Sequence, residues 1–170
     1  FFDTDWEAIV DGQNHPPLFL GNPPWVTNSG LGVLGGLNLP EKTNLKGLRG
    51  FEALTGKSNF DISEWMMIRL LECLQRRGGG IALLCKTAVA RKMLQYASDR
   101  SHSFSNAMIF SIDASKVFGA AVDACFFVFE VNPCNKDYAA KVFKSIDSSS
   151  ASTTIGIVNG LLVANLDLYK

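Results

Sequence analysis

The chain of 170 residues is long enough to bury a core and short enough for a single domain. Its composition, 47% hydrophobic and 19% charged, is that of a globular protein, and no apolar run is long enough to span a bilayer. Lys plus Arg and Asp plus Glu number 16 each, so there is no overall basic field, and contact with nucleic acid would need a local patch.

The cysteines and histidines argue against a disulfide framework and a metal centre. The four cysteines form no C-x-x-C pair and three lie in apolar runs, so we expect reduced, buried cysteines in a cytoplasmic protein. His15 and His102 lie far apart in the sequence without metal-ligand spacing, so no metal site is expected. The N-terminus shows no basic-then-apolar signal pattern.

The most informative stretch is a short apolar run that is followed by hydrogen-bond acceptors and an aromatic ring. It follows Pro17 and reads Leu18-Phe19-Leu20-Gly21-Asn22-Pro23-Pro24-Trp25, the first part having strand composition. The two prolines remove N–H donors and leave the nearby carbonyls as acceptors. Asn22 adds an amide acceptor and Trp25 a flat face. Such a socket suits a planar group that carries an NH₂.

The run Gly21–Val26 resembles the Asn-Pro-Pro-aromatic catalytic motif of S-adenosylmethionine-dependent amino-methyltransferases, above all the N6-adenine DNA methyltransferases of restriction-modification systems. Together with Ser58–Ile62, it resembles the branch in which methylase and endonuclease often share one chain. The family more often has Tyr or Phe in place of Trp25. A Pro-rich turn that closes a buried strand is the alternative. The order of elements downstream favours the methyltransferase.

The resemblance implies that Asn22, Pro23, Pro24 and Trp25 are catalytic. Asn22 and the Pro23 carbonyl would accept hydrogen bonds from the target amino group and aim its lone pair at the methyl group of S-adenosylmethionine, while Trp25 stacks on an extruded base. Phe1, with Asn22, is expected beside the cofactor. For Phe1 the alternative, an aromatic anchor in a connecting loop, stays open.

A long Gly-rich segment, Thr27 to Lys57, follows the motif. Its run Gly30–Gly35 formally matches G-x-G-x-x-G, but no strand precedes it and no clear helix pattern follows, so we reject a dinucleotide fingerprint. The resemblance implies that the segment covers the substrate and meets phosphate oxygens. A solvated loop is the alternative. Its basic residues are Lys42, Lys46, Arg49 and Lys57.

Two helices and a strand follow in alternation. Asp61, with Glu64 three places later, predicts the start of a helix that the glycines 78–80 end. Ile81–Cys85 has the composition of a strand buried on both faces. Thr87 is a candidate cap for a helix over Ala88–Ala97. Short links between these elements favour parallel strand pairing.

Three basic residues, Lys86, Arg91 and Lys92, cluster where the strand ends, which is the edge at which ligands bind in doubly wound sheets. The resemblance implies contact with the DNA backbone. An ordinary solvated helix start is the alternative.

The last third of the chain predicts further strands. Ala107–Ile112 and Cys125–Val131 are joined by a link too short for a crossover helix, which favours an antiparallel pair and fits the family's antiparallel edge strand. Phe118 and Phe127 would line the base pocket or pack in the core, and packing is favoured for each. Asn159-Gly160 between two β-prone runs predicts a hairpin.

We therefore predict an α/β fold: the second half of a doubly wound, Rossmann-like methyltransferase sheet, mostly parallel with an antiparallel edge strand, followed by a β-hairpin extension. Residues 1–135 would be the catalytic half of a class I methyltransferase domain, and residues 136–170 a bridge toward a target-recognition domain.

The predicted function is methyl transfer to the N6 amino group of adenine in DNA, within a larger polypeptide that supplies an N-terminal half and a recognition domain. The chain alone is expected to be inactive, because most of the cofactor site would lie upstream. Two alternatives stay open. One is an amino-methyltransferase of protein glutamine or RNA, and the other is a non-catalytic module that binds DNA or a partner.

Overall fold

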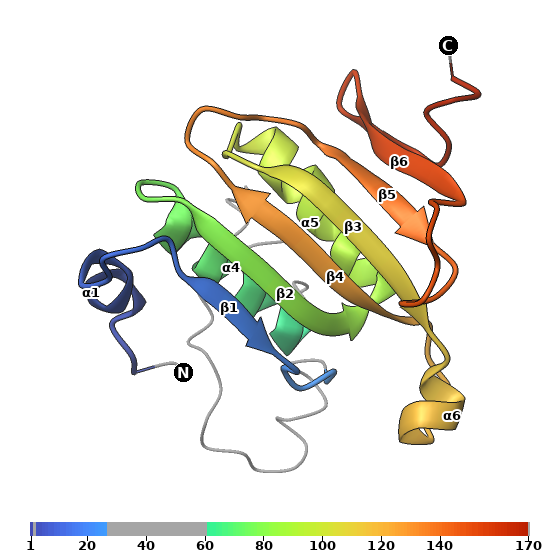
Figure 1. The fold of residues 1–170 in the computed structure, drawn as a ribbon, viewed down its shortest axis with the longest axis horizontal. Coiled ribbons are helices and arrows are strands. Elements are labelled where there is room, and N and C mark those ends of the chain that lie inside the picture. Colours follow the sequence, from blue (N-terminus) through green and yellow to red (C-terminus); the bar gives the residue numbers. More distant parts are fainter. Residues whose placement is uncertain (2, 27–60, 170) are drawn as a thin grey trace, which may run out of the picture.

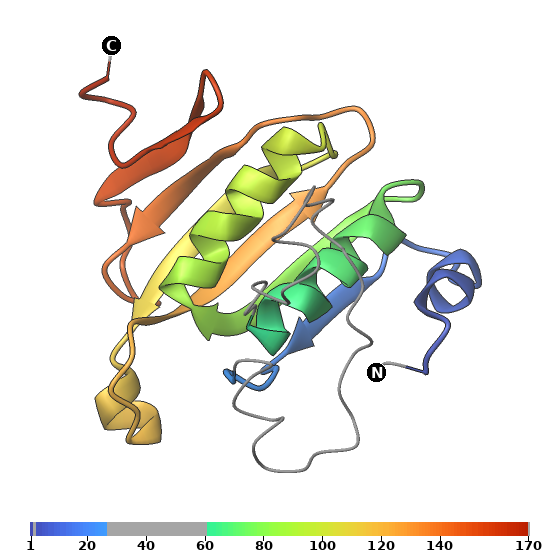
Figure 2. The ribbon, with the colours of Figure 1, turned by 180° about the vertical axis from the view of Figure 1, so that it is seen from behind.

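One mixed β-sheet with helices against one face forms the body of the chain, as a computed structural model shows for residues 1, 3–26 and 61–169 (Figures 1 and 2). In chain order the elements of this part are α1 (Trp6–Asp11), β1 (Leu18–Gly21), α4 (Ile62–Leu74), β2 (Gly79–Lys86), α5 (Thr87–Asp99), β3 (Ser105–Ile112), α6 (Ala114–Phe118), β4 (Ala124–Val131), β5 (Ala139–Phe143), β6 (Thr153–Val158) and β7 (Leu161–Val163).

The sheet has the strand order β1-β2-β4-β3-β5-β6-β7. The pairs β1–β2 and β3–β5 are parallel, and the other four pairs are antiparallel. The predicted α/β class and the antiparallel β3–β4 pair are confirmed. Two details differ: the sheet is not mostly parallel, and β4 lies between β2 and β3 rather than at an edge. Both differences follow because β4 pairs along its whole length with β2, while β5–β7 extend the sheet beyond β3.

Helix α4 begins where the sequence predicts. The carboxylate of Asp61 accepts a hydrogen bond from the backbone N–H of Ser63 at 3.0 Å and so caps the helix. After Leu74 the chain turns back through the triple glycine, and Gly78 N–H donates to the Leu74 carbonyl. Thr87 is the first residue of α5 and not its cap, because Lys86 occupies the N-cap position and makes no side-chain capping bond.

The core lies between the sheet and the two long helices, which cover a single face of it (Figure 2). Phe104 stacks on Phe129, with ring centroids 4.6 Å apart, and Phe127 is fully buried beside them. Phe127 is therefore a packing residue, as the sequence favoured. The free cysteines Cys73, Cys85 and Cys125 are buried, but Cys134 is exposed, against expectation.

The C-terminal strands continue the same sheet. Val158 pairs with Leu161 across Asn159-Gly160, whose φ angles of 52° and 78° are both left-handed, as a type I′ hairpin turn requires. The predicted hairpin is confirmed, and the domain division after residue 135 stays a prediction. No helix in the described ranges combines the length and the apolarity needed to cross a membrane.

Two ion pairs join α4 to the end of β2 and the start of α5. The Asp61 carboxylate lies 2.7 Å from Nζ of Lys86, and the Glu64 carboxylate lies 3.0 Å from Nζ of Lys92. Both acids are buried, whereas the Lys92 side chain is half exposed. Since a buried carboxylate is costly without a partner, these lysines hold the first turn of α4 against β2 and α5.

We expect Lys86→Met to lower the free energy of unfolding by about 2 kcal/mol, because it leaves the buried Asp61 charge without its cation. Urea denaturation of the chain measures this change. Adding Asp61→Asn to Lys86→Met should recover part of the loss. The matched control is Lys116→Met, which breaks the solvent-exposed pair with Asp113 and should leave the unfolding midpoint unchanged. Equal losses in Lys86→Met and Lys116→Met would contradict this assignment.

Candidate active site

The predicted motif lies at the carboxyl end of β1. The parallel β1–β2 register runs from Leu18 opposite Gly80 to Gly21 opposite Leu83, and Asn22 is the first residue beyond it. β3 ends at the same edge of the sheet and leads into α6 (Figure 1). Ligands of doubly wound sheets bind at this edge, so the fold places the motif where a site is expected.

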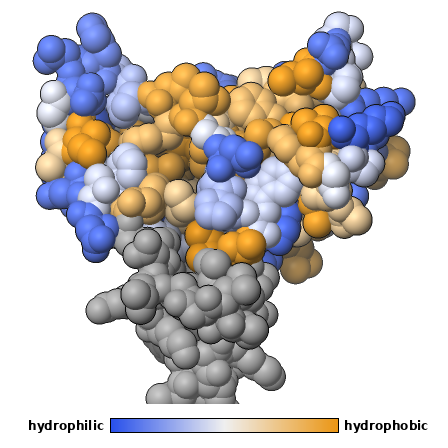
Figure 3. Space-filling model, turned by 90° about the horizontal axis from the view of Figure 1, so that it is seen from below, coloured by the Kyte–Doolittle hydropathy of each residue, from blue (hydrophilic) through white to orange (hydrophobic). Residues whose placement is uncertain are grey.

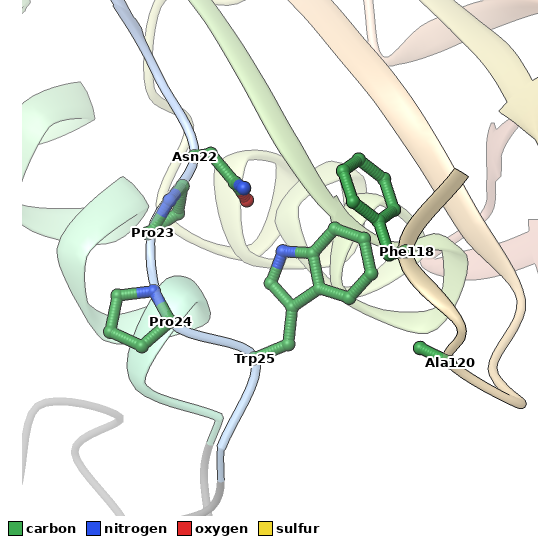
Figure 4. Close-up of a pocket in the computed structure, with 6 residues that line it drawn as sticks. All are labelled: Asn22, Pro23, Pro24, Trp25, Phe118 and Ala120. Carbon is green, nitrogen blue, oxygen red and sulfur yellow. The ribbon is translucent and has the colours of Figure 1, made fainter. Parts of the chain in front are cut away.

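A pocket of about 290 Å³ opens at this edge. Figure 4 shows the Asn22 amide directed toward the indole of Trp25, with Phe118 on the far side of the ring. The Asn22 side chain is exposed to solvent, whereas Pro23 is buried. The structure thus brings together all four predicted catalytic residues and adds two from the α6 link. The lining residues are Asn22, Pro23, Pro24, Trp25, Phe118 and Ala120.

Trp25 is fixed on two sides. Its indole Nε1–H donates to the backbone carbonyl of Leu84 in β2 at 3.2 Å. Its ring meets Phe118 edge to face, with centroids 5.4 Å apart and planes at 83°. Edge-to-face geometry is a favoured arrangement of aromatic pairs. The ring is therefore held by β2 and by α6, which are separate in sequence.

Phe118 reaches the pocket because α6 is short and capped at both ends. Asp113 accepts a hydrogen bond from Lys116 N–H at 3.2 Å, and Gly119 ends the helix with a φ of 64°. The Ser115 hydroxyl and Lys116 hold the pKa of Asp113 below its usual value. Sequence reasoning favoured packing for Phe118, and the signal that pointed to the pocket was an aromatic in the link that follows β3.

The surface around the pocket is apolar in part. Partly exposed hydrophobic residues gather there, and Figure 3, seen from this end of the molecule, shows hydrophobic patches interleaved with hydrophilic ones. These residues are Val26, Val117, Phe118 and Val122. Among the described residues, no charged side chain lines the pocket itself. The described pocket walls therefore suit an uncharged planar group.

The described residues on either side of residues 27–60 lie close together. The Val26 carbonyl accepts a hydrogen bond from Ile62 N–H at 2.9 Å, next to the capping residue Asp61. The rejected Gly30–Gly35 match and residues 58–60 of the resemblance lie outside the described residues. The same holds for the four predicted phosphate contacts, Lys42, Lys46, Arg49 and Lys57.

The other predicted site residues have different surroundings. Phe1 packs against Trp6 and Trp65, with ring centroids 4.7 and 5.8 Å away, which is the arrangement of an aromatic anchor. Its cofactor role stays a prediction. Lys86 and Lys92 bind the carboxylates of α4, whereas Arg91 is exposed. Within the described residues, no group of three or more His, Cys, Asp or Glu is placed to hold a metal ion.

Cys85 and Cys125 lie opposite each other in β2 and β4, just inside this edge of the sheet. Their sulfur atoms are 3.8 Å apart and neither residue is exposed. The contact with Cys125 and burial both raise the pKa of the Cys85 thiol. Cys85 is therefore a neutral packing residue of the core.

Comparison with known proteins tests the resemblance. No family model matches the chain. Over all 170 residues it is 43% identical to the Type II methyltransferase M.NspV of Nostoc sp., and it spans 35% of that protein's length. A solved Type IIL restriction-modification enzyme, MmeI in complex with DNA, aligns with 96% of this chain and 20% of its own, at 18% identity and a TM-score of 0.49. Along its whole length the chain is therefore similar to a Type II methyltransferase, which bears out the resemblance to a methyltransferase that the motif predicts.

Proposed function

We propose that this chain is the catalytic part of a DNA methyltransferase that transfers a methyl group from S-adenosylmethionine to the N6 amino group of adenine. The observation that carries the proposal is the pocket that Asn22, Pro23 and Trp25 line, in which the Asn22 amide is directed toward the Trp25 ring. The relationship to a Type II methyltransferase supports methyl transfer. Adenine is proposed because the motif begins with Asn, whereas the resemblance associates Ser with N4-cytosine enzymes.

The residues of the pocket would act by alignment. The side-chain oxygen of Asn22 and the carbonyl of Pro23 accept the two N–H bonds of the target amine, which turns its lone pair toward the methyl donor. No side-chain base is needed for the attack, so proximity, orientation and exclusion of water supply most of the rate. When bound, S-adenosylmethionine would supply an electrophilic methyl group on a sulfonium. The pocket walls formed by the described residues carry no charge and so fit a neutral amine next to that cationic donor.

The rings would hold an extruded base. Enzymes that modify a base in a duplex take it out of the stack and bind it between aromatic or apolar side chains. Trp25 and Phe118 both line the pocket with their ring planes at 83°, and Phe118 is 43% exposed. A purine that stacks on Trp25 would have its amino group next to Asn22.

DNA and further parts of a longer polypeptide are the proposed partners. The chain spans about a third of the relative that it matches, which supports a longer parent chain, and an N-terminal half and a recognition domain are the other parts that we propose for it. Residues 1–135 would then complete the methyltransferase domain and residues 136–170 lead onward. Because Lys86 and Lys92 already bind carboxylates, Arg91 is the better-placed contact for a phosphate.

We expect Asn22→Ala to reduce methyl transfer by the parent polypeptide about 100-fold or more, because an acceptor that acts on the reacting amine is lost. The side chain is exposed, so the thermal unfolding midpoint should not change. Radiolabelled methyl transfer from S-adenosylmethionine to DNA, RNA and a protein extract measures the effect. Asn132→Ala, at the opposite end of the sheet, is the matched control and should keep full activity.

Each outcome of this assay is informative. Transfer to adenine in DNA that is lost in Asn22→Ala supports the proposal, and mapping the product gives the target site. Transfer to RNA or protein would keep the pocket chemistry and overturn the DNA assignment. Retained activity in Asn22→Ala, or no transfer to any acceptor, would contradict the catalytic role.

We expect the 170-residue chain alone to bind S-adenosylmethionine far more weakly than the parent polypeptide does. In the family that the motif resembles, the strand and turn that hold the methionine and ribose precede the motif. Isothermal titration calorimetry of both proteins tests this expectation. A dissociation constant in the low micromolar range for the chain alone would refute it.

A further inference from the structure

The last residues of β2 have an edge that β1 does not cover. The β1–β2 register stops at Leu83, whereas β2 continues to Lys86. Thr87 N–H donates to the Asp123 carbonyl at 2.9 Å, and hydrogen-bonded positions alternate along an antiparallel pair. Thr87 and Cys85 are therefore hydrogen-bonded positions of the β2–β4 pair, and Leu84 is not. The N–H and C=O of Leu84 point away from β4, toward the side on which β1 lies. The Leu84 carbonyl therefore faces the motif and needs a donor.

Trp25 supplies that donor. Its Nε1 lies 3.2 Å from the Leu84 oxygen, so a side-chain N–H makes the hydrogen bond that a longer β1 would have made to this carbonyl. Phenylalanine has no N–H, and the hydroxyl of tyrosine lies at the far end of its ring. Of the three aromatic residues found at this place of the motif, tryptophan alone can combine this bond with a stacking face.

We propose that the indole N–H of Trp25 is a positioning group that holds the ring ready before the target base arrives. The inference rests on the proposed function. The bond to Leu84 and the edge-to-face contact with Phe118, at 5.4 Å, restrain the ring from two directions. A ring that is already ordered takes up an extruded base without a further loss of side-chain freedom, so pre-organisation favours the extruded state.

The test removes the donor and keeps the ring. Trp25 is replaced in the parent polypeptide by 3-benzothienylalanine, in which sulfur takes the place of the N–H. On the mapped duplex we expect kcat to fall about fivefold, which is the factor for one net hydrogen bond of about 1 kcal/mol. KM for DNA should change less than twofold, because the bond acts after the duplex has bound.

A mismatched duplex separates positioning from general damage. A mismatched target base leaves the stack at lower cost, so extrusion no longer limits the amount of reactive complex. On this duplex the variant should reach at least half of the wild-type kcat. Trp25→Phe should show the same rescue, and tryptophan delivered at the same codon should restore full activity. Equal losses on both duplexes, or no loss on the paired one, would overturn the proposal.

Failure of the proposed function gives a different result. In that case the wild type transfers no methyl group, and the held ring is judged by NMR on the 170-residue chain. The Trp25 indole N–H should exchange with solvent at least tenfold more slowly than that of free tryptophan, as should that of Trp6, which donates to the Phe1 carbonyl at 3.0 Å. Fast exchange at Trp25 would contradict the proposal that its indole N–H restrains the ring. Slow exchange without any methyl transfer would contradict the proposal that the restrained ring serves to bind an extruded base.

Discussion

The unequal lengths of two paired strands organise the candidate site. β1 has four residues and β2 has eight, so the ladder between them ends while β2 still runs on. The end of β2 that β1 leaves uncovered, with Thr87 directly after it, then binds three separate parts of the chain. The Leu84 carbonyl accepts a hydrogen bond from the Trp25 indole N–H. The Lys86 ammonium pairs with Asp61 at the start of α4, and the Thr87 N–H donates to the Asp123 carbonyl in the link that carries α6. Two parts of the pocket, Trp25 and the link that carries Phe118, are thus held by the end of β2 and the residue that follows it.

Most of the charged residues described near the pocket form ion pairs within the fold. Asp61 and Glu64 are buried carboxylates in the first turn of α4, where the helix dipole favours negative charge. Their partners Lys86 and Lys92 come from the end of β2 and the start of α5. A basic cluster at the carboxyl edge of a sheet therefore does not by itself indicate a phosphate-binding surface, because its cations can form ion pairs with acidic residues of the neighbouring helix.

Local patterns predicted most elements, and long-range pairing decided the rest. The cap at Asp61 and the Asn159-Gly160 turn depend on neighbours in sequence, and both were predicted correctly. The place of β4 between β2 and β3 was missed, because strand order depends on contacts between distant segments. The same limit applies to Phe118 and Phe127. Alternation along β4 turns Phe127 toward the helices, whereas a five-residue helix carries Phe118 to the pocket. The partner of Lys86 was equally invisible in the sequence.

The central place of β4 has a consequence for the order in which the chain folds during synthesis. Among the described strands, β4 alone connects β1–β2 with β3–β5–β6–β7. A growing chain that has left the ribosome as far as β3 therefore holds the β1–β2 pair and a single β3 strand that is not joined to it, with the edges of β2 and β3 both open. Open edges can pair with other chains. The arrival of β4 covers the facing edges of β2 and β3 at once, so residues 124–131 join the parts of a nascent, association-prone chain into one sheet, which β5–β7 then extend.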